Sequence, residues 1–378
     1  MSTRVLIIQP YIPEYRVRFL SELRQALAHR GIELFVAAGR PQGALSNRGD
    51  SSSLQIDYRL EERTLAIAHK RIHWRQIQDV LRELKPGYVI VEQAIKNLEI
   101  YSLLMNQMHG GPRVALWGQG RSYSTKQSRM AALVKQRVTR QSDWFFAYTQ
   151  SGADHVISRG FPSTRVSVLG NTIDTEELQS HLAGITRAQV SAFKREFGLS
   201  EGRTGIFLGA VDDVKGIDFL LAASSRIFRE LPGYRQLIAG EGVRSKDVES
   251  LQRAGWPIRY LGRVSGESKA IALAAADILT IPQWVGLVAV DSIVAARPIV
   301  TTNHTSHSPE FDYLIHGTNA LVTRHDVNAY AQGVIGLLKD QEYLESLKRG
   351  LKISAGHHTL EGMVSSFASG VSSWVASS

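Results

Sequence analysis

The chain has 378 residues, of which 43% are hydrophobic and 21% are charged, and this balance excludes a disordered protein. It contains no cysteine, which excludes disulfides and thiolate chemistry, and no apolar run approaches the ~20 residues that a helix needs to cross a bilayer. The formal net charge is +9, yet no zinc-finger spacing or RNP-type aromatic motif accompanies it, so we expect no nucleic-acid partner.

The N-terminal half of the chain alternates short apolar segments with helical patterns. Arg4 leads directly into the first segment without the pattern of a secretory signal, so we expect a cytoplasmic protein. A helix is indicated over 18–30, where the apolar residues fall on one face. Strands that alternate with helices in this way build βαβ units and a parallel sheet. The strands expected in this half are residues 5–9, 34–38, 88–91, 114–117, 144–148 and 166–169.

Two turns in this half follow expected strands and carry polar side chains. The first contains Tyr11, Tyr15 and Arg16 but no glycine, which argues against the G-x-G-x-x-G turn of dinucleotide-binding proteins. The second is a Gly-Gln-Gly-Arg turn with Gln119 and Arg121, whose glycines permit close approach to the backbone. Both turns suit a hydroxylated or phosphorylated ligand, and a proline-stiffened loop without a ligand is the alternative for the first.

The excess positive charge lies in this half of the chain. Residues 1–170 hold 24 Lys and Arg against 13 Asp and Glu, whereas residues 171–378 hold 20 against 22. One basic segment is 69–75; the other, 121–140, has no acidic residue and carries apolar residues at helical spacing. A basic amphipathic helix suits an anionic lipid surface, where each basic residue adds about 1 kcal/mol of attraction. A solvated surface helix is the alternative.

The alternation of strands and helices restarts after a polar, mainly helical stretch over 171–203. Strands are expected at residues 205–208, 236–239, 258–261, 278–281, 298–301 and 320–322, and helices at 218–228, 246–253, 268–275 and 329–338. Apolar residues at helical spacing indicate a last helix over 360–374. We therefore predict an α/β protein with two doubly wound parallel-sheet domains, 1–170 and 171–355. A C-terminal helix within 356–378 is expected to pack back towards the first domain.

Ligands of open parallel sheets bind beyond the carboxyl ends of the strands, so the turns of the second half are candidates for a site. Lys215 lies just before a helix start, where a lysine and free backbone N–H groups can meet an anion. The turn Gly240-Glu241-Gly242 ends the next strand. Asp291 lies about one and a half turns into an apolar helix, where it could reach two vicinal hydroxyls; a helix-end charge is its alternative.

Several motifs of this half come in a familiar order. They are Gly209…Lys215-Gly216, Gly240-Glu241-Gly242, Val285-Gly286-Leu287, Ala295-Ala296-Arg297-Pro298-Ile299-Val300, Ser308-Pro309-Glu310 and His316-Gly317-Thr318-Asn319-Ala320-Leu321-Val322. Together they resemble the nucleotide-sugar domain of the retaining family 4 glycosyltransferases with the GT-B fold, well over 144–350 and loosely over the first 140 residues. The resemblance implies two Rossmann-like domains facing each other across a cleft, with a nucleotide-diphosphate sugar on the second domain and a lipid-linked or oligosaccharide acceptor on the first. It implies no cofactor and no metal, and the sequence has no Asp-x-Asp.

The resemblance also assigns roles to single residues. Lys215 matches the lysine that binds the donor diphosphate, and residues 285–287 match the loop whose amides approach phosphate and sugar. Gln283 and Asp291 stand at the two positions of a Glu-x7-Glu pair, and Ala210 replaces a usual arginine. The residues so assigned to catalysis are Lys215, Gln283, Gly286 and Leu287. Those assigned to the donor are Gly209, Lys215, Gly240, Glu241, Gly242, Val285, Gly286, Leu287, Asp291 and Glu310. The acceptor, which the resemblance places on the first domain, is expected at the polar residues of its two turns, Tyr11, Tyr15, Arg16, Gln119 and Arg121.

These assignments predict a retaining, metal-independent hexosyltransferase of cell-surface polysaccharide or glycolipid synthesis, peripheral on the inner face of the membrane. Ala210 and Gln283 favour an alternative, a non-catalytic GT-B homologue that binds a nucleotide or glycan for a partner enzyme. A third interpretation is a sugar-nucleotide epimerase, which shares the architecture, although the missing carboxylates argue against its acid–base chemistry.

Overall fold

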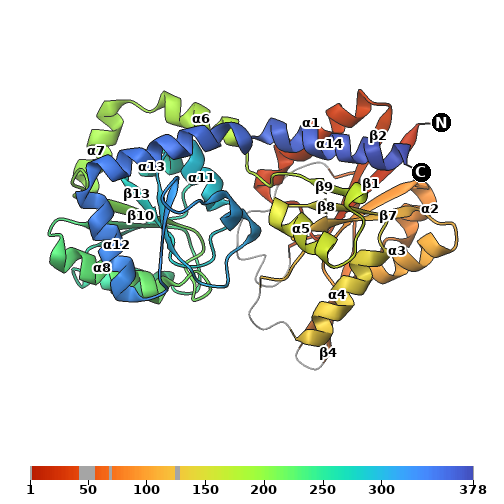
Figure 1. Cartoon of the computed structure of the whole chain (residues 1–378), viewed down its shortest axis with the longest axis horizontal. Coiled ribbons are helices and arrows are strands. Elements are labelled where there is room, and N and C mark those ends of the chain that lie inside the picture. Colours follow the sequence, from red (N-terminus) through yellow and green to blue (C-terminus); the bar gives the residue numbers. More distant parts are fainter. Residues whose placement is uncertain (1, 42–55, 68–69, 124–127, 378) are drawn as a thin grey trace. The chain divides into compact units, whose positions relative to one another are not determined.

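The computed structural model describes residues 2–41, 56–67, 70–123 and 128–377 (Figure 1). Its contacts divide the chain into two compact units. The first unit combines Met1–Asn171 with Leu360–Ser378, and the second unit is Thr172–Thr359. Among the described residues, no helix is long and apolar enough to cross a membrane.

The first unit is built on a parallel sheet of seven strands in the order β3-β2-β1-β6-β7-β8-β9. Its strands are β1 (Thr3–Gln9), β2 (Ile32–Ala38), β3 (Tyr58–Arg59), β6 (Tyr88–Glu92), β7 (Arg113–Gly118), β8 (Trp144–Ala147) and β9 (Val166–Val168). Its helices are η1 (Glu14–Arg16), α1 (Val17–Ala28), α2 (Gln78–Leu84), α3 (Glu99–Met108), α4 (Arg129–Gln141), α5 (Gln150–Ser158), η3 (Ser163–Arg165) and α14 (Leu360–Ala376).

Helices cover both faces of this sheet because its strands are apolar on both sides. One face packs on α1 and α14, with Phe19, Phe367 and Trp374 fully buried. The other packs on α2, α3, α4 and α5. The helix α14, drawn in dark blue in Figure 1, returns from the end of the chain to lie beside α1. The sheet therefore takes part of its core from a segment that is distant in sequence.

A two-stranded antiparallel hairpin adds to the first unit, and the sequence analysis did not predict it. The hairpin pairs β4 (Glu62–Ile67) with β5 (Lys70–Arg75). Arg75, which the sequence analysis counted only as part of a basic segment, is 2% exposed and forms ion pairs with Glu62 and Glu99. The charge of this residue is thus neutralised inside the fold.

The second unit has a parallel sheet of six strands in the order β12-β11-β10-β13-β14-β15. Its strands are β10 (Thr204–Leu208), β11 (Arg235–Ala239), β12 (Ile258–Gly262), β13 (Ile278–Thr280), β14 (Ile299–Thr302) and β15 (Ala320–Thr323). Its helices are α6 (Thr175–Gly184), α7 (Arg187–Phe197), α8 (Ile217–Glu230), α9 (Ser245–Arg253), α10 (Gly266–Ala275), α11 (Val288–Ala295), η4 (Pro309–Tyr313), α12 (Val327–Lys339), α13 (Gln341–Ser354) and η5 (Ala355–His357).

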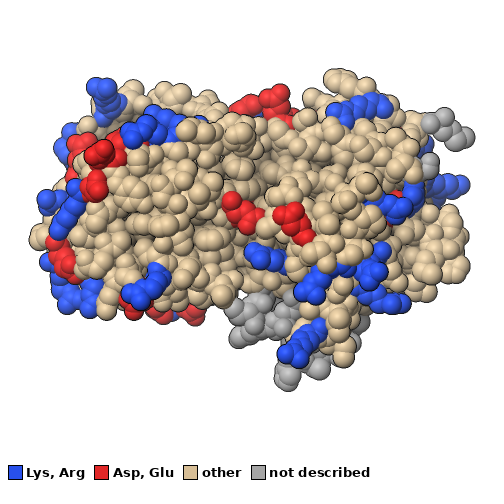
Figure 2. Space-filling view, in the orientation of Figure 1, with Lys and Arg blue, Asp and Glu red and all other residues tan. Residues whose placement is uncertain are grey.

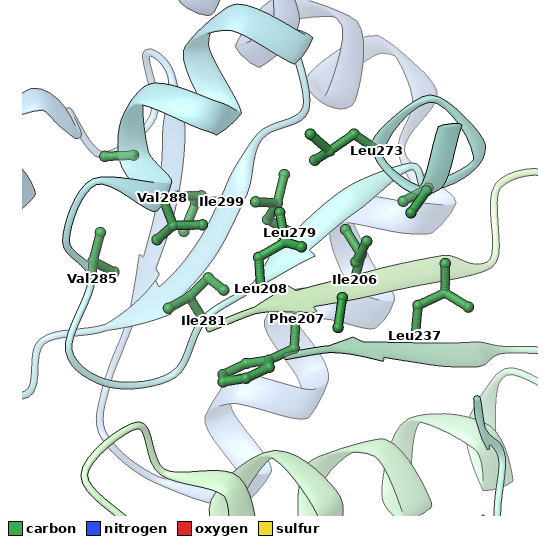
Figure 3. Close-up of a cluster of buried hydrophobic side chains, with 14 of the residues drawn as sticks. Ile206, Phe207, Leu208, Leu237, Leu273, Leu279, Ile281, Val285, Val288 and Ile299 are labelled. Carbon is green, nitrogen blue, oxygen red and sulfur yellow. The ribbon is translucent and has the colours of Figure 1, made fainter. Parts of the chain in front are cut away.

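The core of the second unit fixes the loops at the carboxyl ends of its central strands. Figure 3 shows side chains from β10, β11 and β13 meeting those of Val285 and Val288 in one apolar cluster. Val285 is fully buried, so the loop before α11 is anchored to the sheet by its own side chain. The prediction of two doubly wound parallel-sheet α/β domains is confirmed, and the strands expected at twelve places are all present.

Candidate functional site

Glycines bring the turns after β10 and β11 into direct backbone contact. A Cβ on Gly240 would lie 1.8 Å from the carbonyl oxygen of Gly209, and a Cβ on Gly242 would lie 2.3 Å from that of Val211. Gly240 also has a φ of 141°, a conformation that other residues rarely adopt. Gly240 and Gly242 thus have a packing role, and Glu241 between them is exposed.

Lys215 lies at the start of α8 and reaches the loop that follows β13. Its Nζ donates to the carbonyl oxygen of Trp284 at 2.9 Å, and its backbone N–H donates to Asp212 Oδ1 at 2.9 Å. The side chain runs beside Gly209, whose Cβ position would be 3.6 Å from Lys215 Cε. Gly216, the N-cap of α8, has a φ of 71° and packs against Gln283, which a Cβ there would approach to 2.9 Å. Lys215 and Gln283 are therefore neighbours.

The loop 282–287 is held in one conformation by the segment after β14. Trp284 has a φ of 50°, which costs a non-glycine residue of the order of 1–3 kcal/mol and is common at functional sites. The N–H of Val285 donates to His307 Nδ1 at 3.0 Å, and the N–H of Ser308 donates to the Val285 carbonyl at 2.9 Å. The Cβ position of Gly286 would be 3.5 Å from Ser308 Oγ and 3.8 Å from a Glu310 carboxylate oxygen.

His307 supports this loop only in its neutral form. Its Nε2–H donates to the carbonyl oxygen of Thr302 at 2.8 Å, so Nδ1 is the acceptor for Val285. Burial, helped by the nearby positive charges of His304, His325 and Lys215, lowers the pKa of His307 to about 4, although the hydrogen bond to the Thr302 carbonyl opposes this. The loop is thus tied to β14 by an imidazole that stays uncharged near neutral pH.

A second histidine, His325, orients Gln283. Gln283 Nε2 lies 3.2 Å from His325 Nε2, and His325 Nδ1 lies 3.0 Å from Thr302 Oγ1. The Thr302 hydroxyl donates to the Pro282 carbonyl at 2.7 Å, so its oxygen is left to accept from His325 Nδ1–H. His325 Nε2 is then the acceptor for the Gln283 amide. Burial lowers the pKa of His325, which favours this neutral tautomer, and its ring stacks on Phe219.

Asp291 lies on the first turn of α11, directly after the loop 282–287. It is 8% exposed, and its carboxylate forms an ion pair of 2.5 Å with Lys269 Nζ on α10. The carboxylate joins two helices here. The role of holding ribose hydroxyls stays a prediction for Asp291, and a ligand there would share the carboxylate with Lys269.

The acceptor residues predicted in the first unit have unlike surroundings. Tyr15 is 36% exposed, whereas Arg16 is 6% exposed; the Arg16 guanidinium donates to Asn171 and lies 5.1 Å from the ring centroids of Tyr15 and Trp117. Arg16 therefore has a structural role in the core. Tyr11 is half-buried, beside the end of β1.

The Gly-Gln-Gly-Arg turn, predicted to bind a ligand, has a packing reason for its glycines. A Cβ on Gly118 would lie 2.6 Å from Gln93 Cβ, and a Cβ on Gly120 would lie 2.3 Å from the carbonyl oxygen of Gly152 on α5. Arg121, at the end of the turn, is exposed and stacks on the ring of Tyr123 at 4.5 Å. Gln119 is half-buried.

Three residues of the site were missed by the sequence analysis: Lys269, His307 and His325. A histidine signals little by itself, because one partner of each comes from a loop more than 20 residues away: Val285 for His307 and Gln283 for His325. The one available signal was the density of histidines after β14, in Asn303-His304-Thr305-Ser306-His307. Among the described residues, no group of three or more His, Cys, Asp or Glu side chains is arranged to hold a metal ion.

Comparison with known proteins finds a family match over part of the second unit. Residues 202–340, which contain Lys215, the loop 282–287 and His325, match the family model "Glycosyl transferases group 1". The phosphatidyl-myo-inositol mannosyltransferase of Mycolicibacterium smegmatis is 30% identical over 149 residues. That match spans 38% of this chain and only 38% of the length of that protein.

Two solved structures resemble the chain over nearly its whole length. The structure of Alr3699/HepE of Anabaena in complex with UDP and glucose has a TM-score of 0.70 at 13% identity, covering 98% of this chain and 100% of that one. WaaG, a glycosyltransferase involved in lipopolysaccharide biosynthesis, has a TM-score of 0.67 at 14% identity, covering 96% and 98%. Identity this low shows the fold alone. Residues 202–340 therefore match the glycosyl transferases group 1 family, in a chain that has the GT-B fold.

Proposed function

We propose that this chain transfers a sugar from a nucleotide-diphosphate sugar to a lipid-linked or glycan acceptor, with retention of configuration at the anomeric carbon. The observation that carries the proposal is the meeting of Lys215, Gln283 and the loop 282–287 at the carboxyl ends of β10 and β13. These residues lie within the matched family domain. The donor class is supported by the UDP and glucose of the HepE complex, and the lipid-linked acceptor by the name of the mannosyltransferase.

The second unit offers two kinds of donor to a departing diphosphate. The first is the Lys215 ammonium, which has three hydrogen-bond donors and can hold both the Trp284 carbonyl and a phosphate oxygen. The second is the backbone of the loop before α11, because among the described residues the amides of Gly286 and Leu287 have no acceptor within the protein. Fixed donors aimed at developing negative charge commonly supply the largest part of such catalysis.

The proposed reaction balances without a protein nucleophile. The bond between the anomeric carbon and the diphosphate oxygen breaks, and the acceptor hydroxyl oxygen bonds to the same face of that carbon. The hydroxyl proton passes to an oxygen of the departing diphosphate. The positive charge of Lys215 and the loop amides offset the negative charge of the leaving group without a metal ion. We therefore expect removal of metal ions by EDTA to leave the rate unchanged. Gln283, oriented by His325, is placed to hydrogen-bond a sugar hydroxyl.

Nucleoside-diphosphate release tests the proposal. The purified chain is incubated with UDP- and GDP-sugars and a membrane extract as acceptor, and the released nucleotide is measured. We expect release with one donor, and a loss of at least about 100-fold in Lys215→Ala, because removal of one fixed charge-stabilising donor commonly costs this much. The matched control is Lys246→Ala, which removes a lysine near the start of α9. Equal rates in the two variants would contradict the assigned role of Lys215.

A non-catalytic nucleotide- or glycan-binding protein is the second candidate function, favoured by Ala210 and by the uncharged Gln283. It predicts thermal stabilisation of the chain by a nucleotide sugar without nucleotide release, even when the membrane extract is present. Conversion of the donor sugar without nucleotide release would instead indicate an epimerase.

We also propose that the basic first unit docks on an anionic membrane surface. Met130 and Leu133 of α4 are 71% and 62% exposed among basic neighbours, a combination suited to the lipid interface. Co-sedimentation with phosphatidylglycerol vesicles and with neutral phosphatidylcholine vesicles tests this. Binding to the anionic vesicles alone is expected, and equal, negligible binding to both would refute it.

A further inference from the structure

A pocket of about 530 Å³ lies in the first unit between α4, α5 and the turn that follows β7. Its lining brings together cationic groups that are far apart in sequence. They are Arg121 from the turn, Arg129, Lys135 and Arg140 from α4, and His155 and Arg159 from α5 or its end. Phe161 and Val156 form an apolar part of the wall.

The arginines of this pocket carry charges that no ion pair among the described residues balances. No acidic side chain lines it, and among the described residues none of its four arginines forms an ion pair. Neighbouring arginines of the same unit do: Arg113 and Arg165 both pair with Asp143. Figure 2 shows Lys and Arg side chains gathered over the region of α4. Four unpaired arginines around one hollow create a strong local positive potential.

The wall of the pocket is fixed by hydrogen bonds that do not use the guanidinium groups of its arginines. Gln93 donates to the carbonyl of Gly120 at 3.3 Å and to the Thr139 hydroxyl at 2.7 Å, and its Oε1 accepts from the Gly120 N–H. Gln136 of α4 donates to the carbonyl of Arg159 at 3.1 Å, which joins α4 to the end of α5. A wall held in this way needs little reorganisation to bind a ligand.

The pKa values of Lys135 and His155 are both lowered in this pocket. Burial lowers the pKa of Lys135 to about 8, and Glu92 opposes this only in part. Lys135 Nζ donates to the carbonyl of Arg121 at 2.9 Å, so the lysine is held at the base of the turn. Burial also lowers the pKa of His155, and Arg159, Arg121 and Lys135 lower it further. An anion in the pocket would relieve this repulsion.

We propose that this pocket binds a phosphorylated anion, through arginine forks that match the geometry of phosphate oxygens. The phosphate could belong to a soluble molecule or to a lipid head group, which share this chemistry. Binding here does not depend on the proposed transfer, because the donor residues lie in the second unit. Unlike a general basic surface, the pocket has a defined lining. The proposal can therefore be tested by comparing arginines that line the pocket with an arginine that does not.

Calorimetric titration of the full chain with pyrophosphate tests the pocket. We expect binding that weakens about tenfold or more in Arg140→Gln and in Arg159→Gln, since each removes a charge-assisted contact. The matched control is Arg137→Gln, which removes the same charge from an exposed residue of the same helix that does not line the pocket. All three residues are exposed, and equal melting temperatures of the variants would show that they fold alike.

Two results would overturn the proposal: absence of pyrophosphate binding up to millimolar concentration, or an equal loss in Arg137→Gln. The source of the phosphate is distinguished with phosphatidylcholine vesicles that contain phosphatidic acid. Competition between pyrophosphate and these vesicles assigns the pocket to a lipid head group. Vesicle binding that pyrophosphate does not displace, or no vesicle binding, assigns the pocket to a soluble phosphorylated molecule. Failure of nucleotide release in the assay described above would leave both results unchanged.

Discussion

Because His325 orients Gln283, we expect a substitution of His325 to lower the activity, although His325 itself is not assigned to the substrate. His325→Phe keeps a ring to stack on Phe219 but removes the hydrogen bonds to Gln283 and Thr302. We expect the turnover rate to fall about fivefold or more, because one net hydrogen bond is commonly worth about 1 kcal/mol. Nucleotide release measured at saturating donor checks this.

Gln283→Ala provides the control for this first prediction. If His325 acts by positioning Gln283, then His325→Phe should have little further effect in the Gln283→Ala background. Independent, additive losses in the double variant would show that His325 does not act through Gln283.

His307 predicts that acid destabilises the second unit. Its folded pKa is about 4, against an ordinary value of 6.5, so between these pH values the unfolded chain binds the proton more readily. The stability that is present above pH 6.5 should therefore be lost as the pH falls towards 4, by on the order of 3 kcal/mol. Urea denaturation across this range measures the loss. His358, whose pKa is also lowered to about 4 by burial, contributes a similar share.

His307→Gln is the control for this second prediction. It removes the titrating group, so the slope of stability against pH should become shallower while the share from His358 stays. An unchanged slope in His307→Gln would contradict the assignment of the acid sensitivity to His307.

The sequence predicted residues with a local motif better than residues whose surroundings come from tertiary packing. Lys215 and the loop 285–287 could be proposed as site residues because glycine, lysine and helix-start signals stand close together in the chain. Arg16 looked like a ligand residue, and nothing local indicated that Trp117 and Asn171 would enclose it. The same holds for Lys269, the partner of Asp291, which comes from another helix.

At the scale of elements, strands with apolar residues on both faces were predicted and the charged hairpin was not. The strands β1, β6 and β10 are continuous apolar runs, typical of parallel sheets buried on both sides. The hairpin β4–β5 is rich in charged residues and has no run of that kind, so its charges suggested a surface segment. Its Arg75 meets Glu62 and Glu99 in ion pairs that composition does not reveal.

Because the turn after β7 contacts α5 closely, we expect one methyl group added at Gly120 to lower the stability strongly. Gly120→Ala would place its Cβ 2.3 Å from the Gly152 carbonyl, in a residue whose φ is 73°. Because backbone lies on both sides of this contact, we expect a loss of about 2–3 kcal/mol in the free energy of unfolding, measured by urea denaturation.

Gly110→Ala is the matched control for this third prediction. Gly110 has a similar φ of 82°, but a Cβ there would meet no atom within 4 Å. It should therefore show only the cost of the backbone conformation, about 1 kcal/mol. Equal losses in the two variants would mean that the turn can move away from α5.

At the scale of the whole molecule, the charge of the chain follows the division into units. The first unit holds 24 Lys and Arg against 14 Asp and Glu, and the second holds 20 against 21. The second unit has no general positive field to attract a nucleotide, so a diphosphate there would depend on local donors such as Lys215. The surplus charge belongs to the first unit, where part of it lines the pocket between α4 and α5.

The return of the chain end to the first unit predicts that a C-terminal substitution acts on the N-terminal sheet. Phe367 of α14 is fully buried, and its ring stacks on Phe146 of β8 at 4.6 Å. Phe367→Ala should lower the stability of the first unit by about 3–5 kcal/mol, because a large buried ring leaves a cavity. Hydrogen exchange in the full chain should then accelerate in peptides from 1–171 and stay unchanged in peptides from 172–359. Ser365→Ala, an exposed change on the same helix, should alter neither. Equal acceleration in both sets of peptides would show that the two units unfold together.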